Sequence, residues 1–446
     1  MKHITDRALA GVNGPRVFFG ALVAAICFEG LGRKLAPATP QVVWYFLKDV
    51  VLVAGLLAFG IGLREVSWVR RLYRGFGLIL GAAISWTLVQ MANPEQRSMV
   101  LAILGLRSYW LWWLAPLVVA TALRKERDWQ AAGVMLGVVS LIAGLYAMIQ
   151  FEYPSDAPIN QYAWGSDAMG VASVAATGRV RVTSTFSYLS GFVDLTIIAI
   201  PLLLALGLSR RRGVLRWGAT LSAGVLALAA PMTGSRGAVL FAAAGTLVML
   251  LSAGFLATRH GRRLTVAVVA ISTLVWFGGR PALQGVESRF GEEDTSDRFA
   301  QLLEFLPPVT MSVNDYPLFG IGTGMQQNAR IAMGVSSPWE SEGEQGRFLI
   351  EQGPVGYLLI WFARLGLAVA LFRGFRMLRQ AGQRTLSGAC LALAGLSLLG
   401  NMAFDHVWQA LLFVAVGLLL RPVVAYDPQL RNAPAHKAFG RPFVAG

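Results

Sequence analysis

Charged side chains are scarce in this sequence. Only 14% of its 446 residues are Asp, Glu, Lys or Arg, whereas 55% are hydrophobic, and the mean hydropathy is +0.56. So few charges cannot coat a soluble globule of this size, and a disordered chain would show the opposite balance of low hydrophobicity and high charge. The composition therefore excludes a cytosolic enzyme and a disordered protein.

Cysteine and histidine are also rare. The two cysteines, Cys27 and Cys390, lie in apolar runs, which excludes a disulfide framework and a cysteine metal cluster. Three of the four histidines, His3, His260 and His436, fall at positions that we predict to be cytoplasmic, and no spacing identifies a metal site. We therefore expect neither a metal nor another cofactor.

Long apolar runs, in contrast, recur along the whole chain. As helices of ~18 residues or more they are long enough to cross a hydrocarbon core of ~30 Å, and their continuity differs from the alternating pattern of a β-barrel. The sequence thus predicts an all-α polytopic membrane bundle, a single integral membrane domain over residues 1–446. About twelve transmembrane spans are expected, starting near residues 17, 43, 74, 99, 130, 185, 214, 235, 264, 348, 385 and 404.

The placement of positive charge predicts the orientation. Most of the 39 Lys and Arg residues fall in alternate loops on the side that carries both termini, and such loops are cytoplasmic by the positive-inside rule. We expect a retained first span, because the first run lacks a clean signal-peptide cleavage site, and a cytoplasmic tail over 427–446. The net charge of +15 then reflects short cytoplasmic flanks near anionic headgroups, and no nucleic-acid partner is expected.

Two predicted outer segments, about 152–184 and 279–347, are longer than the others. Long loops on a compact frame are commonly functional, and residues 296–306 have the apolar spacing of an amphipathic helix. We expect the second segment, between spans 9 and 10, to form a partly helical cap over the outer face. Within it, Pro317-Leu-Phe-Gly-Ile-Gly-Thr-Gly predicts a tight, close-packed turn, because no βαβ unit surrounds these glycines.

Two arginines lie where the charge bias does not favour them. Arg181 precedes the sixth span, and Arg236 follows Thr233-Gly-Ser at the turn between the seventh and eighth spans, both on the predicted outer side. Arg236 either snorkels at a tight turn or belongs to an anion site with the Ser235 hydroxyl and the N–H groups that begin the eighth span. Two arginines facing one cavity suit a diphosphate, because each planar fork pairs bidentately with phosphate oxygens.

Three glutamates, Glu340, Glu342 and Glu344, alternate just before the tenth span. They either complement the dipole of the helix that follows or supply a general base, since a carboxylate beside other carboxylates and apolar surface holds a proton more tightly. The alternation alone does not identify which of the three would be the base.

Charged residues also fall inside the second and fourth apolar runs, where charge is costly. Lys48 and Asp49 are neighbours that either neutralise each other or face a ligand cavity. Arg107 either lines the same cavity or snorkels beside the tryptophans that follow it.

The order of these motifs resembles that of the O-antigen ligase and bacterial exopolysaccharide polymerase superfamily. Over about residues 178–360 the chain carries four matching features in sequence. They are Arg181-Val-Thr-Ser-Thr-Phe, Thr233-Gly-Ser-Arg-Gly-Ala, Asp297-Arg298 leading to the Pro317 glycine motif, and Glu351-Gln-Gly-Pro-Val-Gly.

This resemblance implies an inverting, metal-independent glycosyltransferase of the bacterial inner membrane. Such an enzyme moves a glycan from a polyprenyl diphosphate to an acceptor hydroxyl at the periplasmic face, in a bilayer that it shares with flippase and chain-length-regulator proteins. The resemblance implies that Arg181 and Arg236 hold the diphosphate, and that Glu342 is the base with Glu344 as alternate. The implied supporting contacts to phosphate or sugar are Arg298 and Arg347, with Ser235, Arg107, Lys48 and Glu340 as further substrate contacts.

The loop departs from the ligase pattern at one position. Ligase members place a His-Asn pair about nine residues before the glutamate that matches Glu351, whereas Glu342 occupies that place here and the loop has no histidine. The departure favours a polysaccharide polymerase over a ligase that joins glycan to lipid A-core. A permease or channel is the alternative of another class, although no internal repeat of the kind found in inverted-repeat transporters is visible.

Overall fold

A computed structural model gives the structure of the protein and describes residues 14–36, 40–60, 76–163, 173, 179–209, 213–254, 316–341 and 343–426. The regular elements in these ranges are helices, with no strand beyond one isolated β-bridge between Ser173 and Val180, so the predicted all-α class is confirmed for the part that is described. Outside these ranges lie the expected ninth span, the expected helix over 296–306, the tail over 427–446, and two predicted site residues, Arg298 and Glu342.

The first helices form a bent pair followed by a long helix. α2 (Gly14–Cys27) and α3 (Glu29–Leu35) meet at 61° and α4 (Gln41–Phe59) packs beside both. Large apolar side chains of α4, among them Val50 and Leu57, are exposed, as suits a helix that faces lipid.

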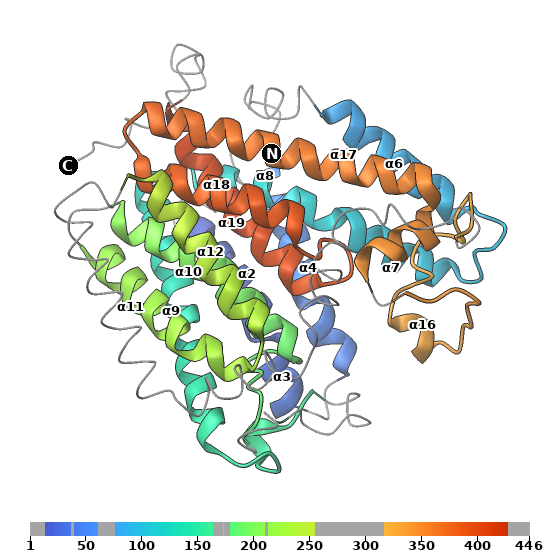
Figure 1. The fold of residues 1–446 in the computed structure, drawn as a ribbon, viewed down its shortest axis with the longest axis horizontal. Helices are drawn as coiled ribbons and strands as arrows, with labels where there is room; N and C mark the ends of the chain where they lie inside the picture. The colour runs from blue at the N-terminus through green and yellow to red at the C-terminus, as the bar shows by residue number, and fades with distance from the viewer. Residues whose placement is uncertain are drawn as a thin grey trace, which may run out of the picture.

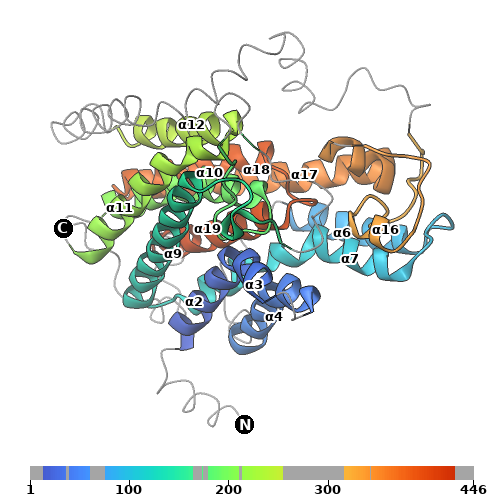
Figure 2. The same ribbon diagram turned by 90° about the horizontal axis from the view of Figure 1, so that it is seen from below.

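A second group of helices runs from α6 (Gly77–Met91) through α7 (Met99–Trp110), η2 (Leu111–Leu114) and α8 (Ala115–Ala122). Ser98 caps α7, since its hydroxyl accepts a hydrogen bond from the Leu101 N–H at 3.4 Å. The segment over 316–341, with the short α16 (Ala329–Ala332), packs beside α7 (Figures 1 and 2). This is the described part of the expected cap.

The middle of the chain forms a block of long helices. The helix α11 packs on both α9 and α10, and α12 packs on α10 (Figure 1). A 3-10 turn, η4, leads from α11 into the Ser235-capped start of α12. The bounds are α9 (Glu126–Glu152), η3 (Pro158–Asn160), α10 (Leu189–Leu208), α11 (Val214–Ala229), η4 (Ala230–Thr233) and α12 (Arg236–Ser252).

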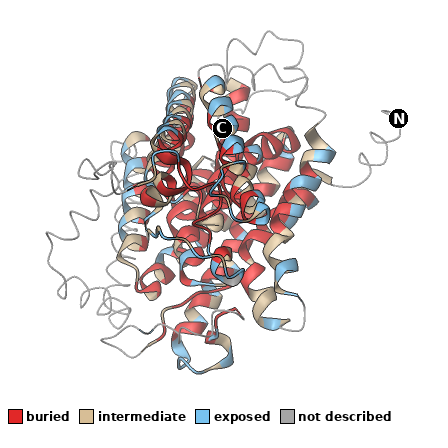
Figure 3. Cartoon of the chain, turned by 90° about the vertical axis from the view of Figure 1, so that its right-hand side faces the viewer, coloured by how far each residue is buried: buried red, intermediate tan, exposed pale blue. Residues whose placement is uncertain are grey.

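The last three helices complete the bundle. α17 (Glu344–Gln380) is broken at Gly353, whose φ of 65° and ψ of 177° precede Pro354, and it packs on α6 and α18 (Arg384–Leu399). α19 (His406–Tyr426) is buried along nearly its whole length, and buried residues are concentrated in the middle of the molecule (Figure 3).

The helices have the dimensions of a membrane protein. Among the described residues, seven helices are long and apolar enough to cross a membrane, or eight if the bent pair of α2 and α3 is one span. Three shorter apolar helices, α6, α12 and α18, coincide with further predicted spans. The expected span that starts near 264 lies outside the described residues, as does residue 74 just before α6, so the count of twelve stays a prediction. We call the outer end of the bundle the end that carries residues 36, 92–98, 181–187, 230–236 and 400–405.

Candidate functional site at the outer end of the bundle

Arg181 lies against the turn that leads into α12. Its Nε donates a hydrogen bond of 2.8 Å to the carbonyl oxygen of Thr233, and the N–H of Val182 donates one of 3.2 Å to the carbonyl of Met232. Gly234 has a left-handed φ of 62°, and a Cβ there would lie 3.1 Å from the Arg181 Nε. Glycine therefore suits both the turn and the close approach of the guanidinium.

Arg236 is the first residue of α12, only three positions beyond the carbonyl that Arg181 contacts. Ser235 is the N-cap, and its Oγ accepts the Ala238 N–H at 3.3 Å. The Ser235 hydroxyl keeps its own proton available for donation. The structure thus brings the segments of Arg181 and Arg236, 55 positions apart in the printed sequence, to one place at the start of a helix.

The helix α3 packs directly on the segment that follows Arg181. The N–H of Leu31 donates a 2.7 Å hydrogen bond to the carbonyl of Thr185, and the Thr185 hydroxyl donates to the carbonyl of Cys27. A Cβ on Gly30 would lie 1.9 Å from the carbonyl carbon of Phe186, so only glycine permits this contact. Residues 183–187 are consequently held against α3.

Two cations of α3 reach the same segment. The Lys34 Nζ donates to the Thr183 Oγ1 at 2.7 Å and to the Ser184 carbonyl at 3.2 Å. The Arg33 Nη1 donates to the Ser187 Oγ at 3.1 Å. Neither Arg33 nor Lys34 belongs to a motif of the sequence, although both lie on the predicted outer side against the charge bias, the same signal that identified Arg236.

A polar cavity of about 170 Å³ opens beside this segment. It lies between α3, α4, residues 186–191 and the start of α19. This volume is below the roughly 300–1,000 Å³ of pockets for drug-sized ligands, so it suits a smaller group. Its charged and titratable lining consists of Glu29, Arg33, Tyr45, Lys48, Tyr188, Asp405 and His406.

The predicted substrate contacts Lys48 and Arg107 both pair with carboxylates. The buried Lys48 ammonium contacts Glu29, and the Arg107 Nε donates to the Asp49 Oδ2 at 2.7 Å. The alternative in which Lys48 and Asp49 form an ion pair with each other is therefore wrong, because each of them pairs with a residue of another helix. Consecutive helical residues do not face each other, so each of the two meets a different neighbouring helix. Of these two predicted contacts, Lys48 lines the polar cavity.

Two of the three alternating glutamates have cationic partners. The Glu344 carboxylate pairs with the Arg364 Nη1 at 2.8 Å and accepts the Ala403 N–H at 2.8 Å, which fixes the loop after α18. The exposed Glu340 pairs with the Arg330 Nη2 at 2.8 Å. Glu342 lies outside the described residues.

Arg347, a predicted phosphate or sugar contact, lies one turn into α17. Its Nε donates to the Ser341 carbonyl at 2.9 Å, and its guanidinium carbon lies 5.2 Å from the centre of the Phe404 ring. Phe404 also lines the polar cavity, so Arg347 lies close to the cavity wall.

Glu351 holds the glycine turn in place, a role that was not predicted from the sequence. Its fully buried carboxylate accepts hydrogen bonds from the Gly324 N–H at 2.9 Å, from the Gln326 N–H, and from the Tyr109 hydroxyl at 2.8 Å. The tight, close-packed turn predicted for the glycine motif is confirmed, with positive φ angles at Gly320, Gly322 and Gly324. The run of alternating glycines signalled the turn, but nothing local signalled the glutamate that holds it.

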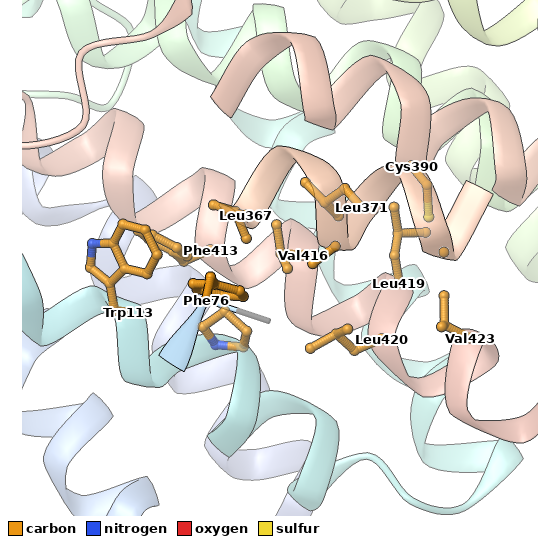
Figure 4. A pocket seen from close by; sticks show the side chains of 13 residues that line it. Phe76, Trp113, Leu367, Leu371, Cys390, Phe413, Val416, Leu419, Leu420 and Val423 are labelled. Atoms are coloured by element: carbon orange, nitrogen blue, oxygen red, sulfur yellow. The ribbon is translucent and has the colours of Figure 1, made fainter. Parts of the chain in front are cut away.

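A second cavity, inside the bundle, differs from the polar one. It measures about 20 Å³, and none of its thirteen lining residues, which include Leu367, Cys390 and Phe413, is charged (Figure 4). An apolar void of this size is a packing defect that stays dry. It offers no group for catalysis or for binding a polar ligand.

The described residues contain no group of three or more His, Cys, Asp or Glu side chains that could hold a metal ion. No protein-family model matches the chain, and no curated protein sequence matches it. What the site can do chemically follows from its side chains. Guanidinium, ammonium and hydroxyl donors gather at one end of an apolar bundle, and such donors can hydrogen-bond an anion.

Proposed function

We propose that this chain is a polysaccharide polymerase, a membrane glycosyltransferase that uses glycans carried on polyprenyl diphosphate. It has about twelve spans in the bacterial inner membrane, both termini in the cytoplasm, and an active site that faces the periplasm. The observation that supports this most is the hydrogen bond from Arg181 to the Thr233 carbonyl, which joins the two segments with the predicted diphosphate-binding arginines.

The proposed reaction is an in-line displacement at the anomeric carbon. An acceptor hydroxyl attacks that carbon, the bond to the diphosphate oxygen breaks, and the electron pair leaves with the lipid diphosphate. Arg181 and Arg236 stabilise this growing negative charge without a metal ion, because fixed donors aimed at developing charge lower the barrier. The α12 N-terminus and the Ser235 hydroxyl add further donors.

The general base takes the proton of the acceptor hydroxyl. Glu340 and Glu344 each pair with an arginine, and Glu344 also accepts backbone N–H groups, so both are already occupied. These contacts favour Glu342 as the base. A carboxylate within hydrogen-bond reach of the acceptor provides about 10²–10⁴-fold of rate enhancement.

The bilayer holds the substrate in place. Exposed apolar side chains along α4 and α17, such as Leu57 and Leu358, offer a surface for the polyprenyl chain. A lipid confined to this surface brings its diphosphate to the outer end, which reduces the entropy lost on reaching the reactive geometry.

The test is transfer by purified protein in nanodiscs, with a lipid-diphosphate oligosaccharide as substrate. We expect Arg181→Ala and Arg236→Ala each to lower the rate by about 10²–10³-fold, as loss of one oxyanion-type donor does. We expect Glu342→Gln to abolish transfer. Arg97→Ala is the matched control, because Arg97 is also at the outer end but bonds Ser336 at the surface. Full activity in both arginine variants of the site would refute the diphosphate assignment.

The product separates the related possibilities. Longer lipid-linked glycan identifies a polymerase, whereas label that migrates with lipid A-core identifies a ligase. Passage of solute across proteoliposomes without any new glycosidic bond identifies a permease or channel and contradicts the proposal.

A further inference from the structure

We infer that Lys34 is a third cation of the diphosphate site and stabilises the additional negative charge that forms when the glycan leaves. The inference rests on the proposed function and extends it from two arginines to a cluster of three cations. None of the motifs in the sequence includes Lys34. Its contacts in the structure place it near Arg181 in the proposed site.

Lys34 is bonded only to neutral oxygens. Among the described residues no carboxylate lies within ion-pairing distance of its ammonium, which donates to the Thr183 hydroxyl and the Ser184 carbonyl. Five other cations of the described bundle pair with acids. These pairs are Arg16 with Asp128, Lys48 with Glu29, Arg107 with Asp49, Arg364 with Glu344, and Arg421 with Glu126.

An ordinary explanation for Lys34 is that a lysine in the last turn of a helix complements the helix dipole or snorkels to water. Such a lysine bonds the final carbonyls of its own helix or extends into solvent. The Lys34 ammonium instead crosses to a segment 149 positions later in the chain. A partly buried cation without a counter-charge is costly, and a bound anion supplies that charge.

The segment that Lys34 contacts also carries Arg181. Thr183 is two positions from Arg181, and two residues span at most about 7 Å of extended chain. Lys34 approaches this segment from α3, while the Arg181 guanidinium lies on the turn before α12. In our proposal, one small anion binds at this segment and contacts both side chains.

The backbone is strained at the point of contact. Ser184 is the one non-glycine residue of the described chain with a positive φ, at 53°. Its conformation is held by hydrogen bonds from its N–H to the Gln150 Oε1 and from its Oγ to the Ala143 carbonyl. Left-handed non-glycine residues are unfavourable and cluster at functional sites. Here the strained residue presents its carbonyl to Lys34.

The change in charge on the diphosphate during the reaction indicates the step at which Lys34 acts. The diphosphate that joins lipid and sugar is a diester with two negative charges, which Arg181 and Arg236 match. When the bond from the anomeric carbon to oxygen breaks, its electron pair stays on the diphosphate, and the acceptor proton passes to the general base. The departing lipid diphosphate gains negative charge, and Lys34 compensates it. Since this added charge exists only in the transition state and the product, Lys34 acts more on the rate than on substrate affinity.

The experiment compares Lys34→Gln, Lys34→Arg and the control Lys125→Gln, an exposed lysine at the opposite end of the bundle. In nanodiscs we expect Lys34→Gln to lower kcat by about 10²-fold with KM for the donor changed less than about threefold. The inhibition constant of polyprenyl diphosphate, the product, rises by about tenfold or more. Lys34→Arg keeps the charge and restores most of kcat, and Lys125→Gln behaves as wild type.

Binding of inorganic pyrophosphate, measured by calorimetry, gives a readout that does not depend on transfer. We expect Lys34→Gln to weaken this binding and Lys125→Gln to leave it unchanged, with all variants melting within a few degrees of wild type. If wild type transfers glycan and Lys34→Gln matches it in kcat, inhibition and pyrophosphate binding, the inference is overturned and the polymerase stands. If Lys34→Gln loses pyrophosphate binding but wild type transfers no glycan, the polymerase fails and the anion site stands.

Discussion

Glu351 shows how a buried acid can serve the fold rather than the chemistry. Its carboxylate is the common acceptor for two backbone N–H groups of the glycine turn and for the Tyr109 hydroxyl of α7. A buried carboxylate is tolerated when hydrogen bonds replace the water it has lost. The residue therefore connects α17, α7 and the turn over 320–326.

At this scale we predict that Glu351→Ala destabilises the protein strongly. The substitution leaves buried donors without an acceptor, at about 1–3 kcal/mol each. The expected loss is at least about 3 kcal/mol, seen as a lower thermal unfolding midpoint by tryptophan fluorescence in detergent. Glu152→Ala is the control, because both side chains of its pair with Arg179 are exposed and such a pair contributes about 1 kcal/mol or less. Equal midpoints for the two variants would show that Glu351 does not hold the turn.

Among the elements, the short helix α3 positions two cations of the outer site although it has only seven residues. It leaves the direction of α2 by 61° and lies across residues 183–187, where Gly30 permits contact with backbone. This packing sets the position of Arg33 and Lys34 relative to Arg181. The outer site therefore depends on the bend between α2 and α3.

We predict that Gly30→Ala disrupts the outer site. The new Cβ would lie 1.9 Å from the Phe186 carbonyl carbon, so α3 must move away from the segment. Overpacking of this kind costs about 1–3 kcal/mol, and we expect transfer activity to fall with it. Gly218→Ala in α11 is the matched control, since a Cβ there meets nothing within 4 Å and alanine favours a helix. Unchanged melting and activity in Gly30→Ala would contradict this account of α3.

For the whole molecule, the apolar runs predicted the helices well. Near every predicted start except the one at 264, which lies outside the described residues, the structure has a helix. Hydrophobic runs of this length report the membrane directly, so tertiary contacts are not needed to find them. The tight glycine turn was also predictable, because positive φ angles at alternate positions require glycine.

The partners of buried charges were not predictable in the same way. Lys48 and Asp49 are adjacent in sequence, yet they pair with Glu29 of α3 and Arg107 of α7. Glu344 was proposed as an alternate base, and the structure pairs it with Arg364 twenty positions later. Such pairings depend on which helices pack together, and helix periodicity carries no information about that choice.

The overall orientation can be tested by cysteine labelling. The native Cys27 and Cys390 are buried, so we expect neither of them to react with the maleimide. We predict that an impermeant maleimide labels Ser336→Cys in intact spheroplasts and labels Gln380→Cys only after permeabilisation. Both positions are exposed. Ser336 precedes α17 and Gln380 is its last residue, and the part of α17 after the break at Gly353 extends about 40 Å. Labelling of both from the same side would refute the proposed topology.

Lys48 pairs with a residue that precedes it in the chain, whereas Asp49 pairs with one that follows it, so the two pairs form at different times during synthesis. During synthesis Glu29 precedes Lys48, so the lysine meets its partner as soon as α4 emerges. Asp49 has to wait for Arg107, 58 residues later. At about 5–20 residues per second the ribosome needs about 3–12 s to supply it. For that interval the nascent helix carries an unmatched acid, and the translocon or a chaperone has to shelter it until the fourth hydrophobic segment arrives.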